Sequence, residues 1–563
     1  MKQIGKQFML GLTTMILMLS CSNNKNDIIE ENGKINIEHG LEFNVDFPDY
    51  NSDVEVSATR SNIIQGTSGD TLSKQIVPIN NDMYAEVVIK KDLMPRKNIP
   101  TRSLENGTYT MLAYKSGQLK GEVTGSVYYN KFHTTMGAVE LDPGTYQFVL
   151  FNDKLTREGN HLIVGEDDVE KALIGRTTYT VSSTPSRQQV TFQMKHCGAR
   201  FRIKIESYTP IVSPTANKYT NGAEPSTAIY DAVTGMWSIG DTFSNFDGIL
   251  TFSGNNNPDA NGIYSVVSNY TYVLYSSYVH DYRFNIGRNQ TQTYNKKFNL
   301  ITSLPISMAP ILPNHSYLIS YKLKFNYLYL MSDGTTGYFN QTTYGGGNKT
   351  PIAIVVNANK RLAMALHDTE NGRAYQWTTN HDFYYRPVNI DQSPDIEVLK
   401  RQENGYQETW DGNYSTSIVT GERVKALRSD FPPFKAAAEY TPGVPLTGTL
   451  VGKKWFLPSI GEAKYVYTLG FGEINRIDGR QGKNYKDKSV NAALKQVGGQ
   501  ELITRTYNPN GVYFTSSESG LDENHPLKYA YGSVFYCSPG YFIVEPQSKY
   551  SGSEIHVRAF IRY

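Results

Sequence analysis

The chain alternates between apolar and polar residues over many short runs. Phe201–Ile205 and Tyr317–Phe325 carry the alternation clearly, and Gly, Asn, Asp and Pro residues separate such runs. Successive side chains of a strand point to opposite faces, so a period of two predicts half-buried antiparallel strands. Strands at this spacing fit β-sandwiches. We therefore predict a mainly β fold, with few helices before about residue 430.

Three domains are predicted from shifts in this pattern. Residues 35–200 and 201–340 each form a β domain, whereas 341–563 forms an α+β domain. Helix signals are confined to the last one. There, Ser459 precedes an apolar periodic stretch, and Glu462 stands three residues further on, which is the spacing of a capping box.

Two further local signals lie in the third domain. The glycine-rich run Tyr344–Asn348 predicts a hinge or a sharp turn. A second helix is expected over Val490–Val497, with Ser489 as its first cap and Gly498–Gly499 as its end.

The N-terminus has the features of an export signal. Lys2 and Lys6 precede an apolar run that ends at Cys21, and this run is too short to span a membrane. A cysteine after a small residue at this place resembles a bacterial lipoprotein signal. The resemblance implies removal of residues 1–20 and acylation of Cys21, palmitate included. Residues 21–34 are polar and predict a solvated tether.

Composition excludes some classes of partner. Residues 1–20 hold two lysines and no acidic residue, so their removal would leave 53 basic and 53 acidic residues. A net charge of zero gives no support to nucleic-acid binding. Cys197 and Cys537 lie far apart in sequence, and we expect two unpaired thiols.

Several phrases in fixed order resemble the fimbrillin family of Bacteroides-type bacteria. They are Thr101–Leu104, Gly107–Tyr114, Leu141–Val149 and Phe192–Arg200. The resemblance covers roughly residues 50–340 and is clearest over 100–205. It implies two transthyretin-like β-sandwiches that form a pilus subunit, with other pilus subunits as partners.

The third domain resembles a module of the C-type-lectin-like and sulfatase-modifying-factor superfamily. The phrases are Trp455–Ser459 with Glu462, Phe514–Glu518, and Val557–Arg558 near the end of the chain. The resemblance implies a ligand-binding module. The related enzymes use active-site cysteines, and residues 341–563 contain only Cys537, so we predict no enzyme activity.

Motifs for metals, cofactors and nucleophiles are missing. Glu545–Gln547 differs from the Glu-Pro-Asn of sugar-binding C-type lectins, and no Trp-Asn-Asp follows. Calcium needs more oxygen ligands than that segment offers. The histidines have no zinc spacing, and no serine stands in a nucleophile motif. We predict no metal and no cofactor.

Four residues of the third domain are candidates for ligand contact. Tyr529, Tyr531 and Tyr541 lie near predicted turns, where exposed rings can stack on sugars or peptides. Glu518 could contact a ligand, cap a turn or hold a buried polar network. Trp455 is expected in the core.

The fimbrillin resemblance also implies proteolytic processing of the chain and a place for it in a pilus. Subunits of this type are cut after an arginine, and Arg60 and Arg102 each follow a strand-like run. Removal of the upstream strand would open a groove for a strand of a neighbour. The stretch 554–561 matches the closing strand of the lectin-like module, so it is not spare for donation. We therefore expect a pilus tip adhesin on the outer membrane surface. The alternative is a non-polymerising anchored lipoprotein that binds a glycan or a protein.

Overall fold

The computed structural model describes most of the chain after residue 32. The described residues are 33–47, 49–50, 71–91, 107–184, 187–220, 224–241, 243–244, 247–254, 257–275, 282–303, 311–473, 482–502, 511–521, 530–538, 540–550 and 555–563. The fold is mainly β, as predicted. The chain forms two compact units, and each takes three separate stretches of sequence. Unit 1 holds residues 1–51, 95–198 and 227–240, and unit 2 holds the rest.

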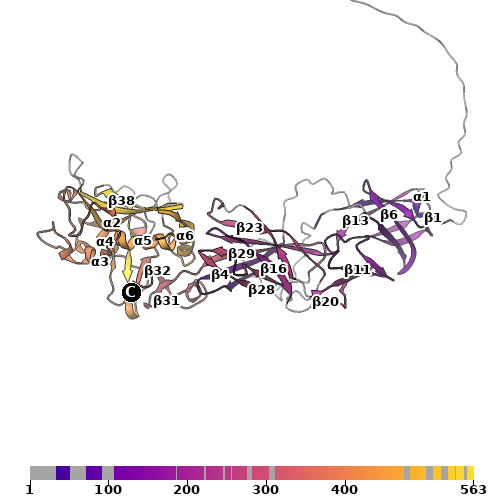
Figure 1. Ribbon diagram of the computed structural model, residues 1–563, viewed down its shortest axis with the longest axis horizontal. Helices are drawn as coiled ribbons and strands as arrows, with labels where there is room; N and C mark the ends of the chain where they lie inside the picture. The colour runs from indigo at the N-terminus through magenta and orange to yellow at the C-terminus, as the bar shows by residue number, and fades with distance from the viewer. Residues whose placement is uncertain are drawn as a thin grey trace, which may run out of the picture. The chain divides into compact units, whose positions relative to one another are not determined.

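Unit 1 is built on an eight-stranded sheet in the order β13-β2-β7-β6-β5-β9-β12-β14 (Figure 1). Phe43 lies on β2 and Phe148 on β9, four strands away, yet their ring centroids are only 5.7 Å apart. Neighbouring strands are spaced by about 4.8 Å, so a flat sheet would hold these rings roughly 19 Å apart. The sheet therefore curls around its core. Its strands are β2 Leu41–Asp46, β5 Tyr109–Lys115, β6 Gln118–Tyr128, β7 Lys131–Met136, β9 Gly144–Asn152, β12 Leu173–Val181, β13 Gln188–Gln193 and β14 Lys195–His196.

Smaller elements complete unit 1. A four-stranded sheet joins β10 (Thr156–Glu158), β11 (His161–Gly165), β18 (Thr227–Asp231) and β19 (Trp237–Ile239). The first described residues form β1 (Ile35–Asn36) and the short helix α1 (Ile37–Gly40). Strand β1 pairs with β8 (Glu140–Leu141).

Unit 2 begins with a β-sandwich. One sheet has the order β22-β23-β15-β29-β4-β3, with β24 paired to β15, and the other has the order β21-β16-β25-β28. Phe201 of the first sheet lies 6.1 Å from Phe284 of the second, ring to ring, inside one apolar core. The strands are β3 Thr71–Pro78, β4 Met83–Lys91, β15 Ala199–Ser207, β16 Ala216–Thr220, β21 Asp247–Leu250, β22 Phe252–Ser253, β23 Tyr264–Ser268, β24 Thr271–Val273, β25 Tyr282–Ile286, β28 Leu300–Ser303 and β29 Ser316–Phe325. Short pairs are β17 (Glu224–Pro225) with β20 (Phe243–Ser244), and β26 (Gln292–Thr293) with β27 (Lys296–Lys297).

The rest of unit 2, from about residue 326, is an α+β module with two sheets. A six-stranded sheet has the order β31-β30-β32-β33-β40-β34, and a five-stranded sheet has the order β35-β38-β37-β36-β39. The strands are β30 Tyr329–Met331, β31 Thr336–Gly337, β32 Pro351–Asn357, β33 Leu362–Ala365, β34 Trp455–Phe456, β35 Gly482–Tyr485, β36 Gly511–Leu521, β37 Ala530–Ser538, β38 Gly540–Ser548, β39 Ile555–His556 and β40 Phe560–Arg562.

Helices fill the space between and beside these sheets. Helix α5 contacts β32 of one sheet and β36 and β37 of the other, and in Figure 1 it lies between them. The first six residues of β32 are all buried, because apolar layers cover both of its faces. The helices are α2 Ile396–Leu399, α3 Gly405–Trp410, α4 Pro432–Ala438, α5 Ile460–Leu469 and α6 Asp487–Lys495, with 3₁₀ turns at Phe339–Gln341 (η2), Thr369–Asn371 (η3), His381–Tyr384 (η4), Gly412–Tyr414 (η5), Lys425–Leu427 (η6) and Gly448–Leu450 (η7).

The predicted domain boundaries are wrong in three places. Strands β3 and β4, expected in the first domain, form a ladder on β29 in the sandwich of unit 2. Strands β18 and β19, expected in the second domain, pair with β11 in unit 1. Strands β30 and β31 already belong to the α+β module, so this module begins before residue 341. A pattern of alternating residues predicts a strand but does not identify the strand with which it pairs.

Other local predictions had mixed outcomes. The capping box of Ser459 and Glu462 is confirmed. Helix α6 begins at Asp487, so Ser489 is not its cap. The Ser489 hydroxyl instead hydrogen-bonds the Tyr327 hydroxyl at 2.7 Å. The glycine run forms a sharp turn inside the module, with Gly346 at φ 91°. Three strand pairs among the described residues, β13–β2, β15–β29 and β36–β39, are parallel, although antiparallel pairing was expected.

Candidate functional site

Four aromatic side chains gather at one surface of the α+β module. His381 and Tyr384 come from η4, Tyr385 follows it, and Tyr550 follows β38. The His381 ring lies 5.4 Å from Tyr384 and 5.1 Å from Tyr385, and Tyr384 lies 5.6 Å from Tyr550, centroid to centroid. Tyr385 and Tyr550 are 38% and 45% exposed. We call these four residues the aromatic patch.

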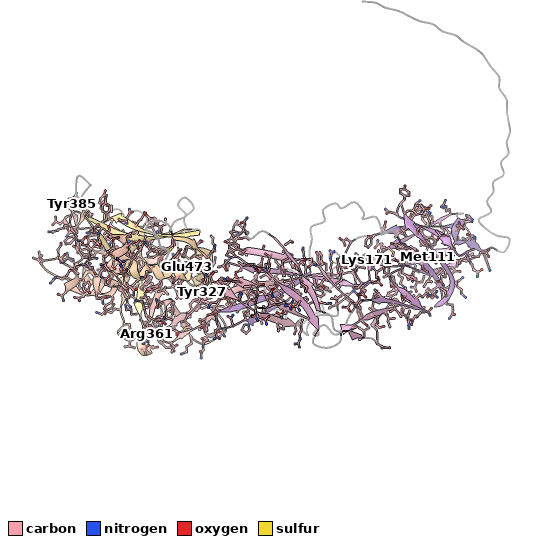
Figure 2. All side chains as sticks on the ribbon, viewed as in Figure 1. Met111, Lys171, Tyr327, Arg361, Tyr385 and Glu473 are labelled. Carbon is pink, nitrogen blue, oxygen red and sulfur yellow. The ribbon has the colours of Figure 1, made fainter. Side chains whose placement is uncertain are left out.

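The patch lies at the outer end of the module. Figure 2 shows Tyr385 at this end and Tyr327 near the opposite end of the same module. Polar side chains border the patch: Arg386 lies 3.8 Å from the Asp382 carboxylate, with its guanidinium 5.5 Å from the Phe383 ring centre. Ring faces with charged groups at their edge are a surface suited to sugars or to peptide side chains.

A buried ion pair fastens the loop that carries the patch. Lys549 and Glu518 are both 0% exposed and form an ion pair. Lys549 also donates to the carbonyls of Phe383 and Arg386, each at 3.1 Å. The three donors of the ammonium group are thereby used, and two of its three acceptors belong to the loop.

The other half of the pair holds the end of the same loop. Glu518 accepts hydrogen bonds from the main-chain N–H groups of Val388 at 2.8 Å and Asn389 at 2.6 Å. Trp377 closes the pair from one side, since the Lys549 nitrogen lies 4.7 Å from its ring centre. Burial lowers the pKa of Lys549, while the Glu518 carboxylate opposes that shift. The loop from Phe383 to Asn389 is thus tied to the core beneath it.

A second buried network lies beside the first. Glu408 of α3 accepts from the Ser516 hydroxyl and, at 3.1 Å, from the Asn389 amide. Burial raises the pKa of Glu408 well above its usual range, and the charge of Asp391 raises it further. Burial also lowers the pKa of Lys425 to about 8, although the negative charge of Glu408 opposes this shift. Both groups are buried, at 1% and 0% exposure, so these shifts accompany their packing in the module.

A small hollow lies within unit 2. It measures about 10 Å³ and is lined by residues of the sandwich and of the module within unit 2. Small-molecule sites usually have about 300–1,000 Å³, so this hollow is too small for one. Its lining residues are Tyr208, Tyr294, Lys324, Phe325, Tyr327, Ser489, Ala492, Ala493 and Gln496.

The structure separates the four predicted ligand residues. Glu518 is the buried partner of Lys549, so of the roles considered for it the buried polar network is the one observed, and a ligand at the surface cannot reach it. Tyr531 is half-buried on β37. Tyr541 lies on β38, but its side chain is outside the described residues, as is all of Tyr529. Cys21, Arg60 and Arg102 also lie outside the described residues.

The aromatic patch was missed in the sequence. Its signal is the dense run His381–Arg386, in which three aromatic residues and a histidine stand beside charged ones. Such a run is too polar for a core strand and too aromatic for an ordinary loop. Tyr550 gave no local signal, because it joins the patch only through the fold. Trp455 is buried in the core, as predicted.

Metal-binding groups and membrane-spanning helices are both absent from the described residues. No group of three or more His, Cys, Asp or Glu side chains within this part of the chain is placed to hold a metal ion. No helix in the same residues has the length and apolar character needed to cross a membrane. Cys197 and Cys537 are both unpaired and buried, as expected.

Comparison with known proteins gives structural neighbours only. No family model and no curated protein matches the chain. A fimbrial protein from Bacteroides ovatus aligns over 93% of this chain and 100% of its own, at 10% identity and a TM-score of 0.25. A fimbrilin from Porphyromonas gingivalis aligns over 42% and 94%, at 10% identity and a TM-score of 0.27. The fimbrial anchor protein Mfa2 of the same species aligns over 53% and 95%, at 8% identity and a TM-score of 0.24.

Proposed function

We propose that this chain is a fimbrillin-type subunit of the cell surface whose α+β module binds a glycan or a protein through the aromatic patch. The observation that carries the proposal is the patch itself: large rings stay exposed on a loop that a buried ion pair holds in place. Exposed aromatic rings supply contact area, and a loop fixed in advance loses little conformational entropy on binding. Together these features favour a binding surface over an ordinary loop.

The anchoring and assembly parts of the proposal come from the sequence. Acylation of Cys21 would tether the chain to the outer membrane, and cleavage after Arg60 or Arg102 would release it into a fimbrium with other pilus subunits. The place of β2 supports strand replacement. It lies between β13 and β7, and its Leu41, Phe43 and Val45 are buried in the core of unit 1.

We place the module at the tip of a pilus. Strand β40 lies between β33 and β34, inside the six-stranded sheet. Ile555, Val557, Ala559 and Ile561 all belong to one apolar core of the module. A strand with both edges paired is not free for donation to a neighbour. A terminal position would also present the aromatic patch to its target.

The proposed role is binding without catalysis. The strongly shifted groups Glu408 and Lys425 are enclosed in the module, at 1% and 0% exposure. Without access for a substrate, such groups do not serve as general acid or base.

Substitution in the patch tests the binding role. We expect Tyr385→Ala and Tyr550→Ala each to weaken binding by about tenfold or more, as for an aromatic residue central to an interface. Full-length chain would be applied to a glycan array and to a panel of host and bacterial surface proteins. Tyr344→Ala is the matched control, since Tyr344 is 55% exposed in the same module but outside the patch. Equal binding by the patch variants and the control would contradict the proposal.

The N-terminus of surface-purified protein distinguishes the two forms of the proposal. A start at Ser61 or Ser103 supports a processed pilus subunit. A start only at acylated Cys21 supports the alternative, an anchored binding lipoprotein that does not polymerise. Immunogold labelling against the module then tests its position: label along the shafts, and not only at their ends, would contradict a tip role.

A further inference from the structure

Two carboxyl groups of the α+β module, those of Glu408 and Asp391, are in direct contact. Glu408 belongs to α3 and is 1% exposed, and its carboxyl group hydrogen-bonds that of Asp391. An ionised carboxylate can only accept hydrogen bonds, so a bond between two carboxyl groups needs a proton on one of them. Two charged carboxylates at a buried site would instead repel each other strongly. We call Glu408 and Asp391 the carboxyl pair.

Asp391 has the contacts of the charged member. One of its carboxylate oxygens accepts from the Asn404 amide, and its main-chain carbonyl accepts from the Gln402 amide at 2.9 Å. Its other carboxylate oxygen, Oδ1, is buried, and no N–H or hydroxyl group of the described residues donates to it. Buried acceptors without a donor are rare in native proteins, because they are destabilising. A proton on Glu408 would supply the missing donor.

Glu408 has the surroundings of the protonated member. Its carboxyl oxygens contact the Asn389 amide, at 3.1 Å, and the Ser516 hydroxyl. The Lys425 ammonium group donates to the main-chain carbonyl of Glu408, at 3.1 Å, and forms no hydrogen bond with its carboxyl group, although the structure describes both residues. Burial raises the pKa of Glu408 well above its usual range, the charge of Asp391 raises it further, and Lys425 opposes the shift.

The balance of charge around α3 also favours one proton on the pair. The charged groups that face the pair or its helix from neighbouring elements are Lys425, Glu518, Lys549, Glu462, Arg562 and Lys454. Four of them pair with each other, Glu518 with Lys549 and Glu462 with Arg562. Lys454 is exposed and lies over the Trp410 ring. Lys425 is thus the buried cation of this group that can offset the pair, and it balances one negative charge but not two.

We propose that the carboxyl pair shares one proton, held on Glu408, and that this proton is a pH-sensitive latch beneath the aromatic patch. Asn389 connects the latch to the patch, because it ends the loop that Glu518 holds and also donates to Glu408. Loss of the proton would place a second negative charge where this loop end meets α3. The two carboxylates would then repel each other, and the loop end would lose its fixed position. The proposal does not depend on the patch binding a ligand.

The effect of pH on stability has a definite sign. The pKa of an unperturbed glutamate is about 4.3, and that of Glu408 is raised in the folded chain. The stabilising effect of the proton is therefore complete below about pH 4 and is lost as the pH rises through the folded pKa. Glu408→Gln would keep a neutral group that donates to Asp391 and accepts from Asn389, but this group does not titrate.

Thermal melting of full-length chains at pH 5 to pH 8 tests the latch. We expect the melting temperature of Glu408→Gln, relative to that of the unmodified chain, to rise by about 3–5 °C across this range. Glu439→Gln is the matched control, since Glu439 lies in the same module with its side chain 64% exposed, and its difference should stay constant. A constant difference for Glu408→Gln would overturn the proposal. Failure of this variant to fold would also overturn it, because glutamine is the neutral isostere of the protonated acid.

Infrared spectroscopy at pH 7 detects the proton directly. A protonated carboxyl group has a carbonyl band that a carboxylate lacks, and labelling with ¹³C-carboxyl glutamate shifts the band if a glutamic acid causes it. We expect such a band in the unmodified chain and in Glu439→Gln, and its loss or clear reduction in Glu408→Gln. No label-sensitive band in the unmodified chain, or an equal band in Glu408→Gln, would show that Glu408 is ionised and would overturn the proposal.

Discussion

Two lysines of the α+β module, Lys425 and Lys549, have no solvent exposure at all. A buried ammonium group is costly, and an ion pair that loses one partner leaves an uncompensated charge in the interior. Lys549 is tolerated because Glu518 and two loop carbonyls complete its shell. At the scale of single residues, therefore, the patch depends on a group that touches no ligand.

Removal of Lys549 should expose that dependence. We expect Lys549→Met to lower the free energy of unfolding by about 3–5 kcal/mol, since Glu518 would remain buried without its partner. The double variant Lys549→Met with Glu518→Gln should recover part of this loss. Urea unfolding followed by fluorescence measures both. The control Lys435→Met breaks an exposed pair with Glu439 and should change stability by less than about 1 kcal/mol. If Lys549→Met lowers the free energy of unfolding as little as the control does, Lys549 is not the buried partner that Glu518 requires.

The sequence predicts buried polar contacts only where the two partners lie close together in the chain. Glu462 could be assigned to a capping box because its partner Ser459 stands three residues away. Glu518 was marked as a candidate, but nothing in the sequence pointed to Lys549, 31 residues further on. The hydrogen bond between Asn389 and Glu408 was missed for the same reason, because only the fold brings α3 next to residue 389.

At the scale of elements, one feature explains most of the boundary errors. Strand β4 carries an alternating pattern, and its residues Met83, Ala85, Val87 and Ile89 are all buried. Its partner β29, however, lies more than two hundred residues later in the sequence. The N-terminal stretch thus supplies β2 to unit 1 and then β3 and β4 to unit 2.

This division gives cuts at the two candidate arginines, Arg60 and Arg102, different consequences. A cut at Arg60 would detach β1, α1 and β2, and unit 2 would keep all its strands. A cut at Arg102 would also detach β3 and β4, and four core side chains of the sandwich would leave with β4. The cost of the second cut is far larger, so we expect Arg60 to be the site that leaves a folded subunit.

Strand replacement at β2 can be measured directly. A chain that begins at Ser61 should bind a labelled peptide of residues 35–47, because the peptide pairs with both β13 and β7. The peptide with Phe43→Ala should bind roughly a hundredfold more weakly, since Phe43 fills the core. Fluorescence anisotropy gives both affinities, and a peptide with Asp46→Ala, changed at the exposed last residue of β2, is the control. If the folded chain binds neither the unmodified peptide nor the control peptide, it has no groove that accepts β2.

At the scale of the whole molecule, the α+β module and the sandwich of unit 2 share one apolar seam. Phe471 follows helix α5 and lies 5.0 Å from Tyr294 and 4.9 Å from Phe325, between ring centres. Its φ of 64° is unusual for a bulky side chain, so the local strain is offset by these contacts. Polar contacts flank the seam, with Tyr84 donating to Gln496 and Lys486 to Tyr264, each at 2.9 Å.

Such a seam makes the module and the sandwich one cooperative body in unfolding. We expect calorimetry of the full-length chain to show them melting in a single transition, and Phe471→Ala to split that transition in two. The variant removes the ring that both cores share, at a cost of about 3 kcal/mol for a large aromatic residue. Tyr129→Ala is the matched control, because Tyr129 also has a positive φ, of 49°, but is 93% exposed in unit 1. If Phe471→Ala still melts in one transition, the seam does not couple the two parts. Under the proposed binding role, a module joined to its sandwich in this way would transmit pulling force to the sandwich without first unfolding.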